Sequence, residues 1–454
     1  MTRLMQRLRS FPALRSNAPS QVSLPGIEPD PAELPERSLN VPGGFFQLRY
    51  AVAHNSSGAY VRGSAELDGG THHGCARLAA ALQLRGEEAV LMSGDPTLAD
   101  FRPERALYFD LETTGLPYGG CSQELPSWQR RRPRATATTP LAFLIGAATI
   151  DSSGTVHLNQ FLLRQQPDEG AQLQAFAALL EGVDYLVSFN GRSFDRNILA
   201  DRMVRNRMNP DRILSLPHLD LLHPSARLYR DALGGARLSL LEGAVLGVTR
   251  SDTEVSGAEV PECWLRYLGT GDPCMLAPVL EHNAADLLSL LTLSAHLARC
   301  LKAPTLCLTE RSMVFAAARM LLQRGQALRG EQLLRRLTGG GADEGLVYRS
   351  LELLAEHLRR SGRHQQALPL WRRMMESGGL DDPKPWRAAI IALERRLSRP
   401  QEALVLVDEF LRRMDEIPSQ VDVAQLEAEF LARRKRLDRR LSRVATHHQR
   451  GTAA

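Results

Sequence analysis

Lysine is nearly absent from this sequence: Lys302, Lys384 and Lys435 are the only lysines among 56 basic residues, and the others are arginines. Cysteine is also sparse, with six residues and no CxxC pair, so neither a disulfide framework nor a zinc ribbon is indicated. The longest apolar run, from Leu141 to Ile150, is far shorter than the roughly 20 residues of a membrane helix. We therefore expect no membrane span and a location in the reducing cytoplasm.

The composition that remains is that of a globular protein. Hydrophobic residues make up 43% of the chain and charged residues 24%, which excludes collagen-like, coiled-coil and wholly disordered classes. Residues 301–454 carry 28 basic and 19 acidic side chains, whereas the first 300 residues carry 28 and 32. This asymmetry is typical of a polyanionic partner, although a GC-rich genome is the simpler explanation of the arginine bias.

Changes of pattern divide the chain into five regions. Residues 1–40 are rich in proline and serine and predict a disordered tail, and residues 41–100 predict a small accessory region. Residues 101–300 alternate strand and helix patterns, which favours an α/β mixed sheet with helices on its faces. Residues 301–415 are helical only, and residues 416–454 form a basic C-terminal helix and tail. Strands are expected at 106–109, 143–150, 156–163 and 185–189, and helices at 172–180, 194–206 and 280–300.

The accessory region contains the segment Thr71-His72-His73-Gly74-Cys75. We expect a strand before it, at 45–50, and an apolar helix after it, at 76–84. Histidine and cysteine together suggest zinc, but four ligands at a familiar spacing are missing. The alternative is a structural turn packed against the main domain.

A weak repeat organises the helical part of the chain. Gly330, Ala367 and Ala403 recur at intervals of 37 and 36 residues, each just before an apolar pair. Small residues at such a period are typical of helical hairpins of the tetratricopeptide kind, in which two helices approach closely. A plain helical bundle is the alternative.

The first segment with chemical character is Phe109-Asp110-Leu111-Glu112-Thr113-Thr114-Gly115-Leu116. Residues i and i+2 of a strand share a face, so Asp110 and Glu112 project together. Two carboxylates at such close range repel each other unless a cation lies between them, and hard divalent metals prefer oxygen ligands. The alternative, two solvated acids on an edge strand, is weakened by the apolar residues around them.

Two further segments each have an ordinary explanation on their own. Asp195 follows Asn190-Gly191 and begins a helix, where aspartate is favoured by capping and by the helix dipole. His282 and Asp286 are separated by four residues and therefore share one face of a helix. An isolated His–Asp pair at this spacing is more often structural than catalytic. Asp220, between these segments, is expected to be a structural acid at a strand–helix junction.

In this order and spacing the three segments resemble the DEDD exonucleases of the RNase H-like superfamily, and among them the YprB-type branch. That superfamily has a DxE at a strand end, an Asn-x-x-x-Phe-Asp segment, and a helix with Tyr-x-x-x-Asp or His-x-x-x-x-Asp. The resemblance covers roughly residues 106–297. It implies an RNase H-like mixed sheet with flanking helices, followed by an all-α domain of tetratricopeptide-like repeats, which that branch often carries.

The resemblance also implies the residues of the site. Two Mg²⁺ or Mn²⁺ ions would clamp the scissile phosphate. The metal-binding acids would be Asp110, Glu112, Asp195 and Asp286. The residues beside the terminal nucleotide or the phosphate would be Thr113, Thr114, Leu116 and Asn190. For Asn190, a purely turn-forming role before glycine is the alternative.

The sequence departs from that pattern in two places. His282 occupies the tyrosine position, one residue nearer Asp286 than in the histidine type, and Glu281 takes the histidine position. We expect His282 to orient or deprotonate the attacking water, the alternative being a buried structural histidine. An insertion near 117–138 either guides a single strand or is a disordered charged loop. Its basic and aromatic residues are Trp128, Arg130, Arg131, Arg132 and Arg134.

These patterns together predict a metal-dependent 3′–5′ exonuclease that hydrolyses phosphodiester bonds in DNA or RNA by a two-metal-ion mechanism. The expected partners are a single strand or 3′ end of nucleic acid and, through the helical repeats, a protein. The alternative function is a nucleic-acid- or protein-binding scaffold whose nuclease-like domain does not turn over.

Overall fold

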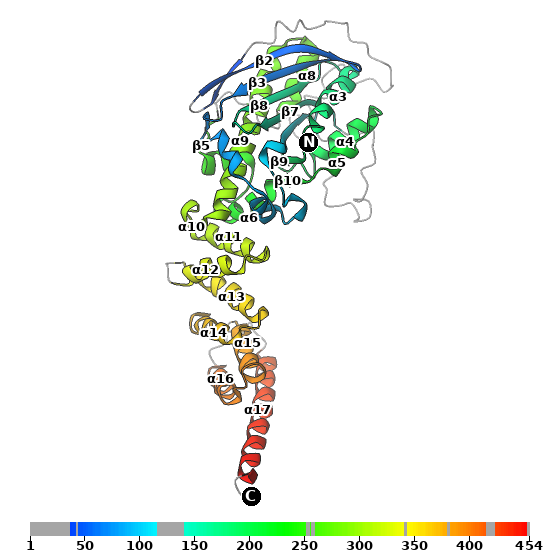
Figure 1. Cartoon of the computed structure of the whole chain (residues 1–454). Helices are drawn as coiled ribbons and strands as arrows, with labels where there is room; N and C mark the ends of the chain where they lie inside the picture. Colours follow the sequence, from blue (N-terminus) through cyan, green and yellow to red (C-terminus); the bar gives the residue numbers. More distant parts are fainter. Residues whose placement is uncertain are drawn as a thin grey trace.

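The computed structural model describes residues 37–41, 44–115, 140–250, 255, 259–339, 343–378, 382–414 and 423–451. In this part of the chain a mixed sheet with helices on both faces continues into an elongated arm of helices (Figure 1). Helix α17 (Val423–Gly451) lies at the end of the arm that is far from the sheet.

Eight described strands form the main sheet, in the order β1-β2-β3-β8-β7-β6-β9-β10. Strand β6 runs parallel to β9, and β9 runs parallel to β10, whereas all other neighbours are antiparallel. The predicted α/β mixed sheet is confirmed. Its strands are β1 (Arg37–Val41), β2 (Gly44–Asn55), β3 (Gly58–Leu67), β6 (Ala106–Thr113), β7 (Ala142–Ile150), β8 (Val156–Leu162), β9 (Tyr185–Ser188) and β10 (His218–Asp220).

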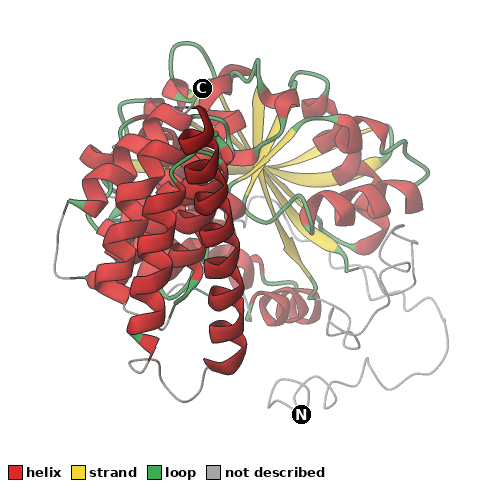
Figure 2. Ribbon diagram, turned by 90° about the horizontal axis from the view of Figure 1, so that it is seen from below, coloured by secondary structure: helices red, strands yellow, loops and turns green. Residues whose placement is uncertain are grey.

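Two helical layers cover the two faces of the sheet (Figure 2). Helices α3 (Glu169–Leu180), α4 (Asp195–Arg205) and α5 (Asp211–Ser215) pack on the face that presents Leu107 and Phe109. The long helix α9 (Ala277–Lys302) packs on the opposite face, together with Tyr108. Since strand side chains alternate, the residues of β6 that share the face of Tyr108 point towards α9.

Helix α9 is apolar along much of its length. By length and composition the segment Cys274–Lys302 is, among the described residues, the one helix that could cross a membrane, and 83% of its most apolar window is buried inside the protein. No membrane span was expected, because the longest apolar run noted in the sequence was Leu141 to Ile150. Polar residues such as Ser289 and Thr292 interrupt the apolar sequence of α9. In the structure those residues are buried and hydrogen-bonded, as in the core helix of a folded domain.

The N-terminal region differs from its prediction. Residues 37–40, expected in the tail, belong to β1, and residues 41–100 are not separate, because β3 pairs with β8 from Val61–Leu162 to Leu67–Val156. Such ladders join segments too far apart in sequence for local patterns to reveal. The expected helix at 76–84 is instead β5 (Ala76–Arg77), paired with β4 (His72–His73), and a 3₁₀ segment over Leu78–Gln83. The Leu78 N–H donates to the Thr71 carbonyl and the Ala79 N–H to the Gly69 carbonyl, both at 2.9 Å, so bonds to the preceding turn hold the start of this segment.

Strand β6 also extends beyond its prediction. The strand was expected to end at Asp110, but it continues to Thr113, with Glu112 paired opposite Leu144 on β7. Asp110 and Glu112 are therefore both held within the sheet rather than at the beginning of a loop. The strand expected at 45–50 likewise extends further, to β2 (Gly44–Asn55). The other strand bounds and the helices at 172–180, 194–206 and 280–300 agree with expectation to within about three residues.

The arm consists of helical hairpins. Helices α11 and α12, α13 and α14, and α15 and α16 pack as successive pairs, and α11 also packs on α6 of the sheet domain. Ala367 and Ala403 are fully buried on the second helix of their pairs, and a Cβ atom at Gly330 would lie 2.6 Å from Leu322 Cγ. The predicted helical hairpins are therefore present, and the tetratricopeptide type stays a prediction. The helices are α11 (Arg311–Gln323), α12 (Ala327–Thr338), α13 (Glu344–Arg360), α14 (His364–Gly378), α15 (Lys384–Arg395) and α16 (Pro400–Arg412).

Shorter helices complete the described structure. They are α2 (Gly86–Ser93), α6 (Leu222–Leu233), α7 (Leu238–Leu241), α8 (Val260–Thr270) and α10 (Pro304–Cys307), with a π-helical turn at Glu242–Leu246 after α7. Among them α8 packs Trp264 flat against Phe143 of β7, with ring centroids 4.7 Å apart.

Candidate active site

Strand β6 places two carboxylates on the face covered by α9. Asp110 and Glu112 alternate with Phe109 and Leu111, which pack on the opposite side of the sheet, so both acids point at α9. Glu112 retains only 8% of its exposure. The shared face predicted from the i and i+2 spacing is thus observed, but inside the protein rather than at a solvated edge.

A hydrogen-bond chain fixes the position of Asp110. Asn283 of α9 donates from Nδ2 to Asp110 Oδ2 at 3.0 Å, and its own Oδ1 accepts from Gln160 Nε2 at 3.0 Å. Gln160 in turn accepts from the Tyr50 hydroxyl at 2.7 Å. A Cβ atom at Gly146, which is paired opposite Asp110, would lie 2.1 Å from Asn283 Oδ1, so this strand position requires glycine.

Helix α9 brings His282 and Asp286 to the same carboxylates. Nε2 of His282 lies 3.6 Å from Asp286 Oδ2 and 4.0 Å from Glu112 Oε1. Nδ1 of His282 accepts a hydrogen bond from Arg250 Nη1 at 2.9 Å, and the same guanidinium forms an ion pair with Asp286. Because a neutral imidazole carries one proton, this contact assigns that proton to Nε2, facing the acids. In this arrangement Nε2 donates, and the role of proton acceptor stays a prediction.

Asp195 is the first residue of α4, and its charge acts on both Asp110 and Glu112. The turn before it is held by Asp220, whose two oxygens accept from the backbone N–H of Asn190 at 2.7 Å and of Arg192 at 3.2 Å. Asn190 has a φ of +67°, a left-handed conformation in which asparagine is favoured. These contacts agree with a structural role for Asp220 and support the turn-forming role of Asn190.

Electrostatic interactions link the acids of the site, because the charges of some raise the pKa of others. Burial raises the pKa of Asp110 well above its usual range, and the charges of Asp286, Glu112 and Asp195 raise it further. Burial, Asp286 and Asp195 likewise raise the pKa of Glu112, against the opposing effect of Arg250. Burial and the charge of Asp220 raise the pKa of Asp195 to about 7. Perturbed carboxylates gathered in this way are typical of functional sites.

The donor set suits a hard divalent cation. Asp110, Glu112, Asp195 and Asp286 offer only carboxylate oxygens, which Mg²⁺ and Mn²⁺ prefer, and a cation would relieve their mutual repulsion. Within the described ranges, no three histidine, cysteine, aspartate or glutamate side chains are already arranged around one cation position. The acids fit such an ion by chemistry and charge.

The residues expected beside a nucleotide join the ends of β6 and β7. Thr114 Oγ1 accepts from the Leu141 N–H at 3.1 Å, and the Thr114 N–H donates to the Leu141 carbonyl at 3.0 Å. Thr113 Oγ1 accepts from the Gly115 N–H at 3.4 Å. Leu116 and the insertion near 117–138, with Trp128, Arg130, Arg131, Arg132 and Arg134, lie outside the described residues. A nucleotide contact by either threonine stays a prediction.

The histidine–cysteine segment forms a packed turn. His73 is 3% exposed and its Nε2 lies 2.7 Å from Ser289 Oγ of α9. The Cys75 N–H donates to the Leu246 carbonyl at 2.7 Å. Both contacts agree with the structural turn rather than with zinc. Likewise His218 is buried against Ser188 at 2.7 Å, and His223 lies on the surface.

Sequence reasoning missed three residues of the site: Asn283, Gln160 and Arg250. A glycine in the middle of an apolar strand, Gly146, was an available signal for Asn283, because it marks a close approach to a neighbouring element. For Arg250 no local pattern stood out among the other arginines.

Comparison with known proteins agrees with this architecture. Residues 135–298 match the family model of the RNase_H superfamily. The sheet domain has an RNase H-like fold. Asp195, His282 and Asp286 lie inside the matched range, whereas Asp110 and Glu112 precede it.

A curated relative covers more of the chain. The sequence is 27% identical over 301 residues to the uncharacterized protein YprB of Bacillus subtilis (strain 168). The alignment covers 65% of this chain and 65% of that protein, so the chain matches about two thirds of the length of its relative. The matched region is therefore similar to nuclease domains of the RNase_H superfamily.

Proposed function

We propose that this protein is a metal-dependent 3′–5′ exonuclease that hydrolyses phosphodiester bonds in DNA or RNA. The observation that carries the proposal is the cluster formed where α9 covers β6, with His282 Nε2 3.6 Å from Asp286 Oδ2 and 4.0 Å from Glu112 Oε1. Burial and the neighbouring acids raise the pKa of both Asp110 and Glu112 there. Holding these carboxylates close together destabilises the fold, and a bound cation would offset that cost. The anionic phosphate of the substrate would then bind to the cation.

Each acid has a defined part in this proposal. Asp110, Glu112, Asp195 and Asp286 would hold Mg²⁺ or Mn²⁺, and two such ions supply charge stabilisation of the phosphate and acidify the attacking water. Asn283 holds Asp110 in one orientation. His282, at the end of the cluster near Glu112 and Asp286, is placed to donate a hydrogen bond from Nε2 and so to orient the attacking water.

The proposal is tested with the full chain and 5′-labelled single-stranded DNA and RNA in the presence of Mg²⁺, Mn²⁺ or EDTA. The expected result is a ladder that shortens from the 3′ end with either metal and is absent in EDTA. Blocking the 3′ hydroxyl of the substrate should abolish the ladder, whereas an internal cut that persists would indicate an endonuclease. No metal-dependent cleavage of any substrate would contradict the proposal.

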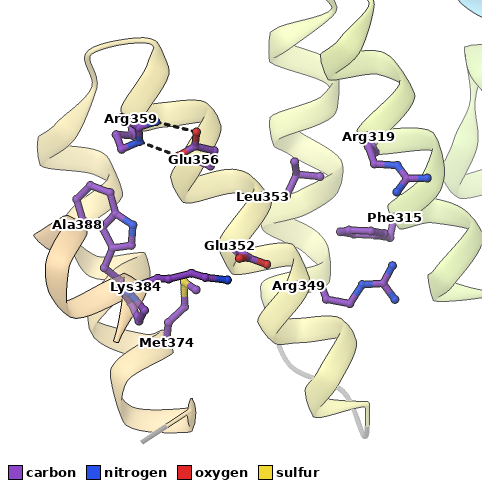
Figure 3. Close-up of a pocket in the computed structure, with 12 residues that line it drawn as sticks. Phe315, Arg319, Arg349, Glu352, Leu353, Glu356, Arg359, Met374, Lys384 and Ala388 are labelled. Atoms are coloured by element: carbon purple, nitrogen blue, oxygen red, sulfur yellow. Dashed lines mark hydrogen bonds and ion pairs between the residues drawn. The ribbon is translucent and has the colours of Figure 1, made fainter. Parts of the chain in front are cut away.

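A second candidate is a binding role for the arm, favoured by a groove of about 410 Å³ between α11, α13, α14 and α15 (Figure 3). Phe315 and Met374 give it apolar walls. The close-up shows Arg319 and Arg349 on one side and Lys384 on the other, with Glu352 between them. Four cations against two acids suit an acidic protein segment; the charged residues are Arg319, Arg349, Arg359, Lys384, Glu352 and Glu356.

The two roles are separable by variants. Arg319→Glu combined with Lys384→Glu reverses two groove charges, and we expect it to weaken binding of an acidic peptide while leaving cleavage unchanged. Asp110→Asn should do the opposite. A groove variant that binds acidic peptides as the parent does would exclude this second role.

A further inference from the structure

The His-His-Gly-Cys turn is fixed to the segment that enters the candidate site. Besides the bond from Cys75 to Leu246, Gly74 has a φ of +62°, and a Cβ atom there would lie 2.1 Å from the Leu246 carbonyl oxygen. Only glycine satisfies both conditions. The turn therefore packs tightly on the stretch between Glu242 and Arg250, which follows α7.

From this turn a chain of hydrogen bonds leads to the site. His73 Nε2 lies 2.7 Å from Ser289 Oγ, and the Ser289 hydroxyl donates to Glu242 Oε1. Since serine has one proton, it accepts from His73 and passes its own hydrogen bond to Glu242. Glu242 is 1% exposed and binds Arg250 through two parallel bonds, to Nε and, at 2.6 Å, to Nη2.

Arg250 forms the last link, to the residues that face β6. Its guanidinium pairs with Asp286 and donates to His282 Nδ1 at 2.9 Å. The planar fork of arginine holds a carboxylate on one side while presenting its other N–H groups in fixed directions. Glu242 compensates the charge of Arg250. The main effect of the pair on Asp286 is therefore to fix the orientation of its carboxylate.

We propose that His73, Ser289, Glu242 and Arg250 form a positioning chain that orients Asp286 and His282 for the proposed nuclease reaction. None of the four touches the substrate; they act through the two α9 side chains. The inference rests on the proposed function, and it gives the N-terminal turn a purpose that its sequence did not reveal. It matches the Asp110 side, where Tyr50, Gln160 and Asn283 do the same for the other end of the site.

The test measures Mn²⁺ binding by isothermal titration calorimetry and cleavage kinetics on the same full-length preparations. Arg250→Gln removes the last link, and Ser289→Ala removes an inner link that lies away from the acids. Outer hydrogen-bond partners of metal ligands are typically worth about 10–100-fold in metal affinity or activity. We expect Mn²⁺ affinity and kcat to fall by about that factor in Arg250→Gln and by less in Ser289→Ala, with KM for the substrate unchanged.

His72→Ala is the matched control, because His72 lies in the same turn, next to His73, but is half-buried and outside the chain of bonds. It should bind Mn²⁺ and cleave as the parent does. If Arg250→Gln fails to fold, Ser289→Ala and Arg250→Lys carry the test. Lysine keeps the charge but not the fork, so an Arg250→Lys variant with parental affinity would contradict the orienting role.

The outcomes separate this inference from the proposed function. Loss of Mn²⁺ affinity in the variants, with no cleavage by any protein, would refute the nuclease and leave the positioning chain in place. Parental affinity and kcat in both Arg250→Gln and Ser289→Ala would overturn the chain. Tighter Mn²⁺ binding by Arg250→Gln would also overturn it, since Arg250 would then compete with the metal for Asp286. A parent protein that binds no Mn²⁺ removes the site that the chain is said to orient.

Discussion

Two groups of buried acids, one in the arm and one at the candidate site of the sheet domain, have opposite surroundings. In the arm, burial alone would raise the pKa of Glu331, but hydrogen bonds from Arg363 and Arg335 outweigh it and lower the pKa. The hydrogen bonds from Arg436 lower the pKa of Glu394 in the same way. In the sheet domain, Asp110 and Glu112 face other acids, and their pKa values rise.

This difference in surroundings distinguishes acids that stabilise the fold from acids that are placed for function. A carboxylate that is paired with arginines contributes to the fold and needs nothing more. Carboxylates gathered without enough cations destabilise the fold, and such clusters persist where a ligand restores the balance. Changing one acid in each region should therefore have opposite consequences for activity and stability.

The largest effect is expected from the acids of the sheet domain. Asp110→Asn and Asp195→Asn should each abolish cleavage, because a ligand charge is lost. Unfolding temperature in EDTA should stay the same or rise, since a like charge leaves the cluster and asparagine is a good residue at a helix start. Glu331→Gln in the arm is the matched change: it should lower the unfolding temperature and leave cleavage intact. Near-normal cleavage by either aspartate variant would rule out a metal-binding role for that residue.

His282 should have the next largest effect. Its Nε2 faces Glu112 and Asp286, so His282→Ala should reduce kcat by about 10²–10³-fold, which is within the usual range for a positioned acid or base. His282→Tyr should recover part of the rate if the position is of the tyrosine type. An alanine variant that folds, binds Mn²⁺ and cleaves at the parental rate would identify His282 as structural.

These expectations draw on both sequence and structure. The order of the strands at 143–150, 156–163 and 185–189 was predictable, because apolar runs bounded by turns specify strands locally. The place of β1, β2 and β3 in the same sheet was not predictable, since pairing of β3 with β8 depends on segments about 95 residues apart. Periodicity carries no information on such partners.

The acids of the candidate site were expected from the sequence, whereas the residues that hydrogen-bond to them were not. Asp110, Glu112, Asp195 and Asp286 were expected because the three segments that carry them, in their order, resemble the DEDD motif, whereas Asp195 and Asp286 each had an ordinary structural explanation alone. Asn283, Gln160 and Arg250 act through single contacts across the fold, and an isolated amide or arginine has no distinguishing neighbours in sequence.

Lowering the pH should change the stability contribution of a titratable group in the sheet domain but not that of one in the arm. Burial lowers the pKa of His296, on α9, to about 4 from an unfolded value near 6.5. Its neutral form therefore stabilises the fold above pH 6.5, and this contribution is lost as the pH falls towards 4. Between pH 7.5 and 5 the loss is about 2 kcal/mol.

The measurement compares variants, so that other titrating groups cancel. The difference in free energy of unfolding between the parent and His296→Gln, from urea titrations, should shrink by that amount on going to pH 5. In the arm, hydrogen bonds from Arg359 and Arg360 lower the pKa of Glu356 to about 2, so the corresponding difference for Glu356→Gln should change little. A pH-independent difference for His296→Gln would mean that the histidine is not held neutral.

The smallest effect concerns the basic helix α17, whose arginines fall into two groups. Arg434 pairs with Asp408 at 2.7 Å and Arg436 with Glu394 at 2.6 Å, so these side chains dock the helix onto the arm. Phe430 stacks on Phe410 with ring centroids 3.8 Å apart. Deleting the chain after Met414 would therefore remove these contacts together with any phosphate contacts.

A sharper test uses the outer face of the same helix. Lys435, Arg439 and Arg443 are exposed and four residues apart, so they form one stripe along the helix. If they contact a single strand, changing all three to glutamine should lower the logarithmic salt dependence of binding by about 2, because each contact contributes roughly 0.7. Arg434→Gln, the control, should lower the unfolding temperature without changing that slope. An unchanged slope in the triple variant would assign this stripe to solvent or to a protein partner, and it would then make no contact with the phosphates.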